Sequence, residues 1–458
     1  RRWNGPSLPS KRVGMKISGT SDSLIESAHR LLSLALKEGA TEAEVYGMVG
    51  RSVDVDLRRE YVEMASESYH CGLGLRAVVD GAVGFSSSSD MAQLKFVAMS
   101  AVRSARARGR DDTWIALPQP ERVTEPEGIY DRRLDKISPE ECIDIAHSLL
   151  AGCNEVDGAE PVSGGVACVS GTGFVLNSQG IELVETSTLM QASMEAIARR
   201  DDVATGSEFF NSRHLELSMQ SVGRMAGEMA RASLGGAKGE GGRFDVLLRP
   251  LAVAELLEGA FLTSLEADSV QKGRSSLRGR LGEMIASEDL MIVDDGLLPG
   301  GIDSSAFDGE GVPSQRTVLV ERGILKGFLY DNYTAGKDGV RSTGNSVRSG
   351  YSDLPRVGSR NLIIDSPSAY DLQAETEGYL VHGLIGAHTA NPISGDFSVE
   401  ARNAFRISPG GEAQPIRSLM LAGNIFEILK TIEVGTDRRS IGPIVTPTLK
   451  VKMMVVGS

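Results

Sequence analysis

The sequence predicts an α+β protein. Its N-terminal α/β half contains hairpins and helices, and its C-terminal, glycine-rich domain is dominated by antiparallel sheet. Helix-period and strand-period segments alternate through the first half, whereas short strands and glycine turns fill the second. Glycine makes up 53 of the 458 residues and is spread evenly, which indicates many turns and close backbone contacts rather than one flexible linker. This length suggests two to three domains.

The first elements are a helix and a hairpin. Apolar residues recur at helical spacing after Ser21 or Asp22, and either residue can cap such a helix. Residues 53–58 alternate with period two, as a half-exposed strand does. Asp80-Gly81 lies between two apolar pairs and predicts a hairpin, because a type I′ turn needs positive φ at both central residues.

The rest of the first half continues this alternation. A second helix is predicted from Met91 to about Arg106, followed by a polar connection over 111–135. Ser138-Pro139-Glu140-Glu141 opens a third helix, with serine as its cap and proline in its first turn. Strands then meet at a turn over 177–180, and a last helix spans roughly 214–233.

The glycine-rich stretch LGGAKGEGG at 234–242 predicts the main domain boundary. We therefore expect a disordered extension over 1–14, an N-terminal α+β domain over 15–235 and a C-terminal sheet-rich domain over 243–458. Within the last, we expect a helix at 251–262 and short strands joined by turns.

Composition excludes several classes of function. Lys plus Arg total 48 and Asp plus Glu total 61, so a net charge of −13 argues against a nucleic-acid surface. No apolar run is long enough for a membrane span, so no membrane partner is expected. The four cysteines lack CxxC spacing and suggest thiols in a reducing compartment, hence a cytoplasmic protein.

Catalytic motifs are largely missing. The sequence has no G-x-S-x-G elbow, P-loop or complete G-x-G-x-x-G motif. His382 and His388, with Asp396, could form a metal group, but a strand-end and a loop histidine are the simpler interpretation. Glu255 and Glu258 share one helix face and could do acid–base work, although an ion-paired or solvated face is the plainer alternative.

Two other segments have open interpretations. Asp294-Asp295-Gly296 is most simply a turn. Residues 341–348 place small residues between two arginines, so backbone could approach a ligand while arginine binds a carboxylate. An ordinary surface turn is the alternative for that loop.

The order of motifs resembles the TldD/PmbA family, once called modulators of DNA gyrase. The resemblance covers roughly residues 17–458. The motifs are GLGLRAVVDGAVGFSSSSD, VLNSQGIELVETST, IASEDLMIVDDG, FDGEGVPSQRTVLVERGILKGFLYDNYTA, STGNSVRSGYSDLP, SGDFSVEARNAFRI and MLAGNIFEILKTIEVGTD.

This resemblance implies a two-subunit peptidase. TldD-type chains carry a His-Glu-x-x-x-His helix and a later cysteine that bind zinc, whereas PmbA/TldE-type chains lack them. The corresponding helix here reads LAVAELLEGAFLTSLEAD. No histidine lies between His214 and His382, and no cysteine follows Cys168. The resemblance thus implies a PmbA/TldE-type subunit with no catalytic residue and no metal or other cofactor of its own. Zinc is expected only in a TldD-type partner.

We therefore expect a non-catalytic partner of a zinc metallopeptidase that acts on small or unfolded peptides. It would form a heterodimer with the zinc subunit and help to bind peptide as an added strand. Candidate peptide-binding residues are Gly344, Asn345, Arg348, Gly395 and Asp396. Two alternatives remain open: a homodimeric peptide-binding protein without peptidase activity, and an independent hydrolase using Glu255 and Glu258 with His388.

Overall fold

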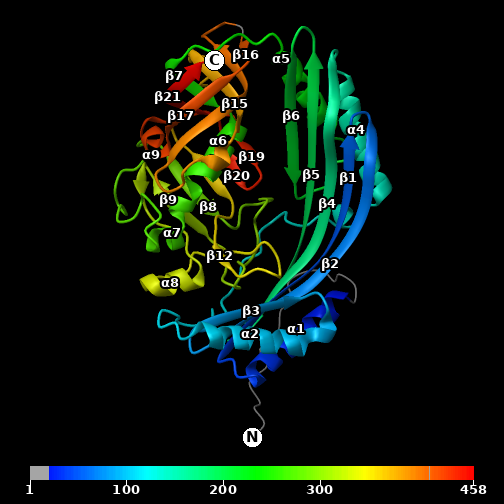
Figure 1. Cartoon of the computed structure of the whole chain (residues 1–458), viewed down its shortest axis with the longest axis vertical. Helices are drawn as coiled ribbons and strands as arrows, with labels where there is room; N and C mark the ends of the chain where they lie inside the picture. Colours follow the sequence, from blue (N-terminus) through cyan, green and yellow to red (C-terminus); the bar gives the residue numbers. More distant parts are fainter. Residues whose placement is uncertain (1–19, 412, 458) are drawn as a thin grey trace.

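The computed structural model describes residues 20–411 and 413–457. A long curved sheet with helices on its outer side forms the N-terminal half, residues 20–234 (Figure 1). A second body of shorter strands and helices, residues 242–457, faces the inner side of that sheet and forms the C-terminal half (Figure 1). The expected α+β class, with antiparallel pairing dominant, is confirmed.

The N-terminal half contains five α-helices, one 3-10 helix and six strands among the described residues. The helices are α1 (Thr20–Lys37), η1 (Met91–Gln93), α2 (Leu94–Arg108), α3 (Arg132–Asp135), α4 (Pro139–Asn154) and α5 (Gln220–Ala232). The strands are β1 (Glu42–Arg58), β2 (Tyr61–Val79), β3 (Ala82–Ser88), β4 (Ala159–Asn177), β5 (Glu182–Arg199) and β6 (Val203–Ser212). They pair antiparallel in the order β3-β2-β1-β4-β5-β6.

Local chemistry explains these elements. Asp80 and Gly81 have φ values of 50° and 78°, which confirms the turn with two positive φ angles between β2 and β3. Ser138 and Glu141 form a complete capping box at the start of α4. The last helix of this half begins only at Gln220, because β6 extends to Ser212 and a connection follows it.

One face of the sheet is apolar. Alternate residues of β1, such as Val45 and Val53, point toward the helices, since side chains alternate between the two faces of a strand. Helices α1 and α2 cover one end of that face, and α4 and α5 cover the other. The opposite face of the sheet is turned toward the C-terminal half, and a cavity forms between the two.

The C-terminal half contains many short elements. Its helices are α6 (Pro250–Ala260), η2 (Leu262–Leu265), α7 (Ala267–Gln271), α8 (Asn332–Asp338), η3 (Ala387–Thr389), α9 (Ile425–Ile428) and η4 (Leu429–Thr431). Its strands are β7 (Gly242–Leu248), β8 (Met291–Asp295), β9 (Arg316–Glu321), β10 (Ile324–Leu325), β11 (Ser346–Val347), β12 (Arg356–Val357), β13 (Leu362–Asp365), β14 (Gly378–Ile385), β15 (Asp396–Ile407), β16 (Gln414–Ile416), β17 (Leu419–Asn424), β18 (Glu433–Val434), β19 (Arg439–Ile441), β20 (Ile444–Thr446) and β21 (Leu449–Gly457).

Two sheets share one core in this half. The first has the order β14-β7-β21-β17-β15, and β14 also pairs with β15, so five strands close into a barrel. The second has the order β10-β9-β8-β13-β20-β19. Helix α6 contributes Leu256 and Leu257 to the core that both sheets share. The expected turn at Asp294-Asp295 is wrong, because these residues end β8, where Asp294 is fully buried.

The division into domains at 235–243 stays a proposal. The expected extension over 1–14 lies outside the described residues.

Candidate functional site

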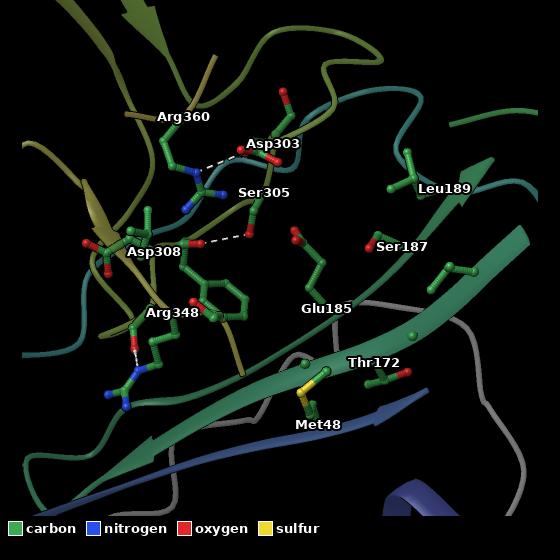
Figure 2. Close-up of a pocket in the computed structure, with 18 of the residues that line it drawn as sticks. Met48, Thr172, Glu185, Ser187, Leu189, Asp303, Ser305, Asp308, Arg348 and Arg360 are labelled. Carbon is green, nitrogen blue, oxygen red and sulfur yellow. Dashed lines mark hydrogen bonds between the residues drawn. The ribbon is translucent and has the colours of Figure 1, made fainter. Parts of the chain in front are cut away.

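A cavity of about 540 Å³ lies between the inner face of the sheet and the C-terminal half, and we call it the sheet cavity (Figure 2). Strands β4 and β5 supply Thr172, Glu185 and Ser187 from below. Asp303 and Arg360 face them from the loops of the C-terminal half. Polar side chains from segments far apart in the sequence therefore meet in this cavity, beside apolar ones such as Met48 and Phe307.

Buried charges hold the walls of the sheet cavity in place. Arg213 donates to the carbonyl oxygens of Thr188, Gly301 and Ile302, so it ties the sheet to the facing loop. Burial lowers the pKa of Arg213, while Asp303 and Glu185 act in the opposite direction. Burial raises the pKa of Glu185, which also accepts a hydrogen bond from the main chain at Ala306.

Four buried side chains, Glu44, Arg76, Glu310 and Arg348, form what we call the junction network. Arg76 contacts both carboxylates at 2.7 Å, Glu44 through Nη2 and Glu310 through Nη1. Arg348 pairs with the second oxygen of Glu44. None of the four side chains is more than 3% exposed. Because Glu44 and Arg76 belong to β1 and β2, the network joins the two halves.

The buried charges of the junction network shift the pKa values of Arg76 and of the adjacent Asp308. Burial lowers the pKa of Arg76, but Glu44 and Glu310 more than offset this, and the net shift is upward. Burial raises the pKa of Asp308 to about 7, and the nearby Glu310 acts in the same direction. Three main-chain N–H groups oppose this rise by donating to Asp308, among them that of Ser346.

The loop expected to bind peptide lies beside this network. Arg348 lines the sheet cavity and donates from Nε to the Gly309 carbonyl at 2.8 Å (Figure 2). Asn345 is fully buried and donates to Asp294 at 2.7 Å, so contact with a peptide would require this loop to move. Gly344 has a φ of 69°, which favours glycine.

The other two candidate residues lie elsewhere. Gly395 precedes β15 with a φ of 81°, and a Cβ there would lie 2.6 Å from Phe426. Asp396 is exposed and accepts hydrogen bonds from Asn424 and Ser394. Neither residue lines the sheet cavity. Binding of a peptide by the five candidates stays a prediction.

Two further cavities of about 620 and 600 Å³ adjoin the start of α6, and we call them the first and second α6 cavities. They share Ser207 and Glu208 of β6, Leu251 of α6 and Asn403 of β15. The second also reaches His382 and the 437–439 segment.

Arginine–carboxylate pairs occupy this region. Glu255 accepts from Arg402 at 3.0 Å and from the main-chain N–H of Leu384. Arg439 pairs in a forked arrangement with Glu208, whose side chain is 4% exposed. The ion-paired interpretation of Glu255 is therefore confirmed.

The histidines do not assemble with other ligands. His382 is buried in β14, and burial lowers its pKa to about 4, so the imidazole is neutral at pH 7. His388 belongs to the separate turn η3. Within residues 20–411 and 413–457, no group of three or more His, Cys, Asp or Glu side chains is arranged to hold a metal ion. No helix in the same ranges is long and apolar enough to cross a membrane.

Comparison with known proteins agrees with this architecture. Models of the PmbA/TldA metallopeptidase match as domain 1 over residues 43–107, as the central domain over 132–234 and as the C-terminal domain over 241–458. A curved sheet facing a small barrel is thus the fold of a metallopeptidase class. The chain belongs to the TldD/PmbA family within it.

Several relatives cover most of the chain. An uncharacterized protein of Methanocaldococcus jannaschii is 32% identical, over 93% of this chain and 99% of its own length. A metalloprotease of Methanothermobacter thermautotrophicus is 27% identical, over 87% and 88%. The crystal structure of TldE from Thermococcus kodakarensis is 26% identical with a TM-score of 0.87, and covers 94% of this chain and all of that one.

Sequence reasoning missed the junction network. Its signal was present, since Arg76 interrupts the apolar run of GLGLRAVV, and an arginine there needs a buried partner. Nothing in the sequence pointed to Glu44 and Glu310 as those partners, because they lie far away along the chain.

Proposed function

We propose that this chain is the non-catalytic partner of a TldD-type zinc subunit, in a complex that acts on small or unfolded peptides. The best support for this proposal comes from the side chains that line the first α6 cavity. A zinc ion does not fit beside Glu255 in the first α6 cavity, because Glu255 is already paired with Arg402 and this cavity is lined by no histidine or cysteine. We propose that it works in the cytoplasm, in keeping with its four free cysteines.

Strand β6 offers a way to bind peptide. Two hydrogen bonds show which main-chain groups point away from the sheet at its outer edge. Asn403 donates to the carbonyl of Thr205, and Arg439 donates to the carbonyl of Phe209. Main-chain groups of alternate residues point to the same side of a strand. Ser207 therefore presents its N–H and C=O to this side, where it lines both α6 cavities. An extended peptide could pair there as an added strand.

We propose a supporting role for the 344–348 loop. Arg348 fixes one wall of the sheet cavity, and Asn345 holds the loop through Asp294. Gly395 and Asp396 would serve at a more distant point on the peptide's path.

Co-expression with a zinc-bearing homologue tests the proposal. We expect the two chains to co-purify, the zinc to reside in the partner, and the complex to cleave an unstructured peptide that neither chain cleaves alone. The matched control is the same complex with a histidine of the partner's zinc motif replaced, which should assemble but not cleave.

Two results would contradict the proposal. One is stoichiometric zinc in the isolated chain, measured by elemental analysis. The other is a zinc-loaded complex without peptidase activity. A chain that only self-associates and binds peptide would instead support the homodimeric alternative.

A further inference from the structure

The second α6 cavity combines an apolar wall with polar groups, one of them the cation of Arg249. Met229 of α5, Leu380 of β14 and Phe405 of β15 supply apolar surface. Arg249, which directly precedes α6, and His382 lie among its polar lining. A site of about 600 Å³ with this mixture suits a ligand that has both a charged end and an apolar side chain.

Arg249 differs from the other arginines of this region. Arg439 pairs with Glu208, and Arg402 pairs with Glu255. The main chain of Arg249 is used, since its N–H donates to Val381 at 2.9 Å, but no carboxylate in the described residues forms an ion pair with its half-buried guanidinium.

The start of α6 adds further donors. The helix has 11 residues, and its first turn leaves main-chain N–H groups without partners inside the helix. Leu251, in that first turn, lines both α6 cavities. The positive end of the helix dipole therefore lies beside Arg249 and favours an anion.

An independent observation also indicates a missing ligand. His382 is only 7% exposed, and its Nδ1 has no hydrogen-bond partner among the described residues. The same holds for Oδ1 of Asn403, whose Nδ2 already donates to Thr205 and Ser233. Buried polar atoms are normally paired, and these two unpaired atoms belong to side chains that line the same cavity, so a polar occupant would offer both of them a partner.

The acidic groups around the cavity do not fill this role. Asp437 accepts from the N–H and the hydroxyl of Thr448. Glu228 is exposed, and Glu208 is held by Arg439. The cation at Arg249 is thus the one of this lining for which the described residues supply no counter-charge.

We propose that the second α6 cavity binds the free C-terminal carboxylate of a peptide whose last side chain is apolar. The carboxylate accepts hydrogen bonds from Arg249, His382 and the first turn of α6, and the side chain packs on Met229, Leu380 and Phe405. This inference rests on the proposed peptide-binding function. Ser207 and the unpaired oxygen of Asn403 favour a peptide over an inorganic anion, because both can pair with a peptide main chain.

The test uses the full-length chain and labelled hexapeptides of one sequence ending in leucine, with either a free carboxylate or a C-terminal amide. Fluorescence anisotropy should show the acid binding at least tenfold more tightly. The acid ending in serine should bind more weakly than the acid ending in leucine, because it leaves the apolar wall uncovered. A hexapeptide amide with an internal glutamate distinguishes a terminal carboxylate from a side-chain one, and it should bind like the plain amide.

Variants locate the effect. Arg249→Gln should remove the difference between acid and amide. The matched control Arg243→Gln changes an exposed arginine of β7 that does not line this cavity, and it should keep the difference. Equal binding of acid and amide by the unaltered chain would overturn the inference and leave the proposed function standing. If neither peptide binds and no partner co-purifies, the proposed function fails as well.

Discussion

Arg348 shows how much one buried side chain can contribute. It joins the second oxygen of Glu44 and two main-chain carbonyls, and its side chain is 1% exposed. Removing it would leave two buried carboxylates, those of Glu44 and Glu310, with Arg76 as the one arginine that pairs with both. We therefore expect the cost to come mainly from the charge that stays behind.

Arg348→Met should lower the free energy of unfolding by about 3–5 kcal/mol, as breaking a buried ion pair does. Urea unfolding followed by circular dichroism would measure it. Arg58→Met is the matched control, because the Arg58–Glu63 pair is 63% and 48% exposed, and it should leave the urea midpoint unchanged. Equal effects of the two substitutions would contradict the buried role of Arg348.

The carboxyl group of Glu266 should make the free energy of unfolding depend on pH. Burial raises its pKa from 4.5 to about 7, so between these values the folded chain holds a proton that the unfolded chain has released. Stability from this group is therefore complete below pH 4.5 and is lost as the pH rises to about 7. Glu266→Gln cannot titrate, so relative to the original chain it should gain roughly 1–2 kcal/mol across this range. Urea unfolding at pH 5 and pH 7.5 measures this difference, and an equal change in both proteins would contradict it.

At the scale of single residues, the sequence predicts contacts within a turn or a helix end, but it does not predict contacts between residues far apart in the chain. Asp80-Gly81 and Ser138 act on their own turn and helix, so the sequence identifies them. Asn345 was chosen as a ligand contact because it lies among small residues in a loop. Its actual partner is Asp294, which lies 51 residues away, and no local pattern indicates that contact.

Helices α4 and α5 approach closely through glycine. A Cβ at Gly223 would overlap the carbonyl oxygen of Leu149, which is main chain and cannot move aside. A Cβ at Gly227, one turn later in the same helix, would meet the side chains of Val156 at 3.0 Å and Ala159 at 3.3 Å.

Gly223→Ala should therefore destabilise the chain by about 1–3 kcal/mol more than Gly227→Ala, because overpacking costs this much while both substitutions improve helix propensity equally. Thermal or urea unfolding of the two variants compares them directly. A smaller loss for Gly223→Ala would show that the helices can separate without cost.

Elements with strong periodicity were predicted well, and irregular ones were not. The third helix has a clear cap and the last strand clear alternation. The first helix has a clear apolar period, but its expected cap at Ser21 or Asp22 is wrong, because α1 begins at Thr20 and both residues lie inside it. The start of α5 was placed too early because the residues that end β6 and the connection after it carry no strong stop signal. Asp294-Asp295-Gly296 looks like a turn in isolation, and only the pairing of β8 with β9 and β13 makes its first two residues a strand.

At the scale of the whole molecule, the α+β class could be predicted from the sequence, but the way in which the two halves pack against each other could not. The sheet cavity arises only where β4 and β5 meet segments more than one hundred residues later in the chain, and the first α6 cavity arises where β6 meets α6 and β15. Such contacts depend on topology, which periodicity does not encode.

We expect the two halves to unfold in one transition, because the junction network is buried between them. Trp114 stacks with Tyr333 of α8 at 6.1 Å and reports on this junction. With Trp3 replaced by Phe, fluorescence and circular dichroism should give the same urea midpoint. In Arg348→Met the fluorescence change should come first, and two separate midpoints in the unaltered chain would contradict the coupling.

The junction network has a consequence for how the two halves respond to heat. Removing charged groups from water costs less as temperature rises, because their hydration becomes less favourable, while apolar burial gains little more. The contacts between Glu44, Arg76, Glu310 and Arg348 therefore become more favourable on warming relative to the apolar cores. The joint between the halves should be among the last contacts that warming weakens.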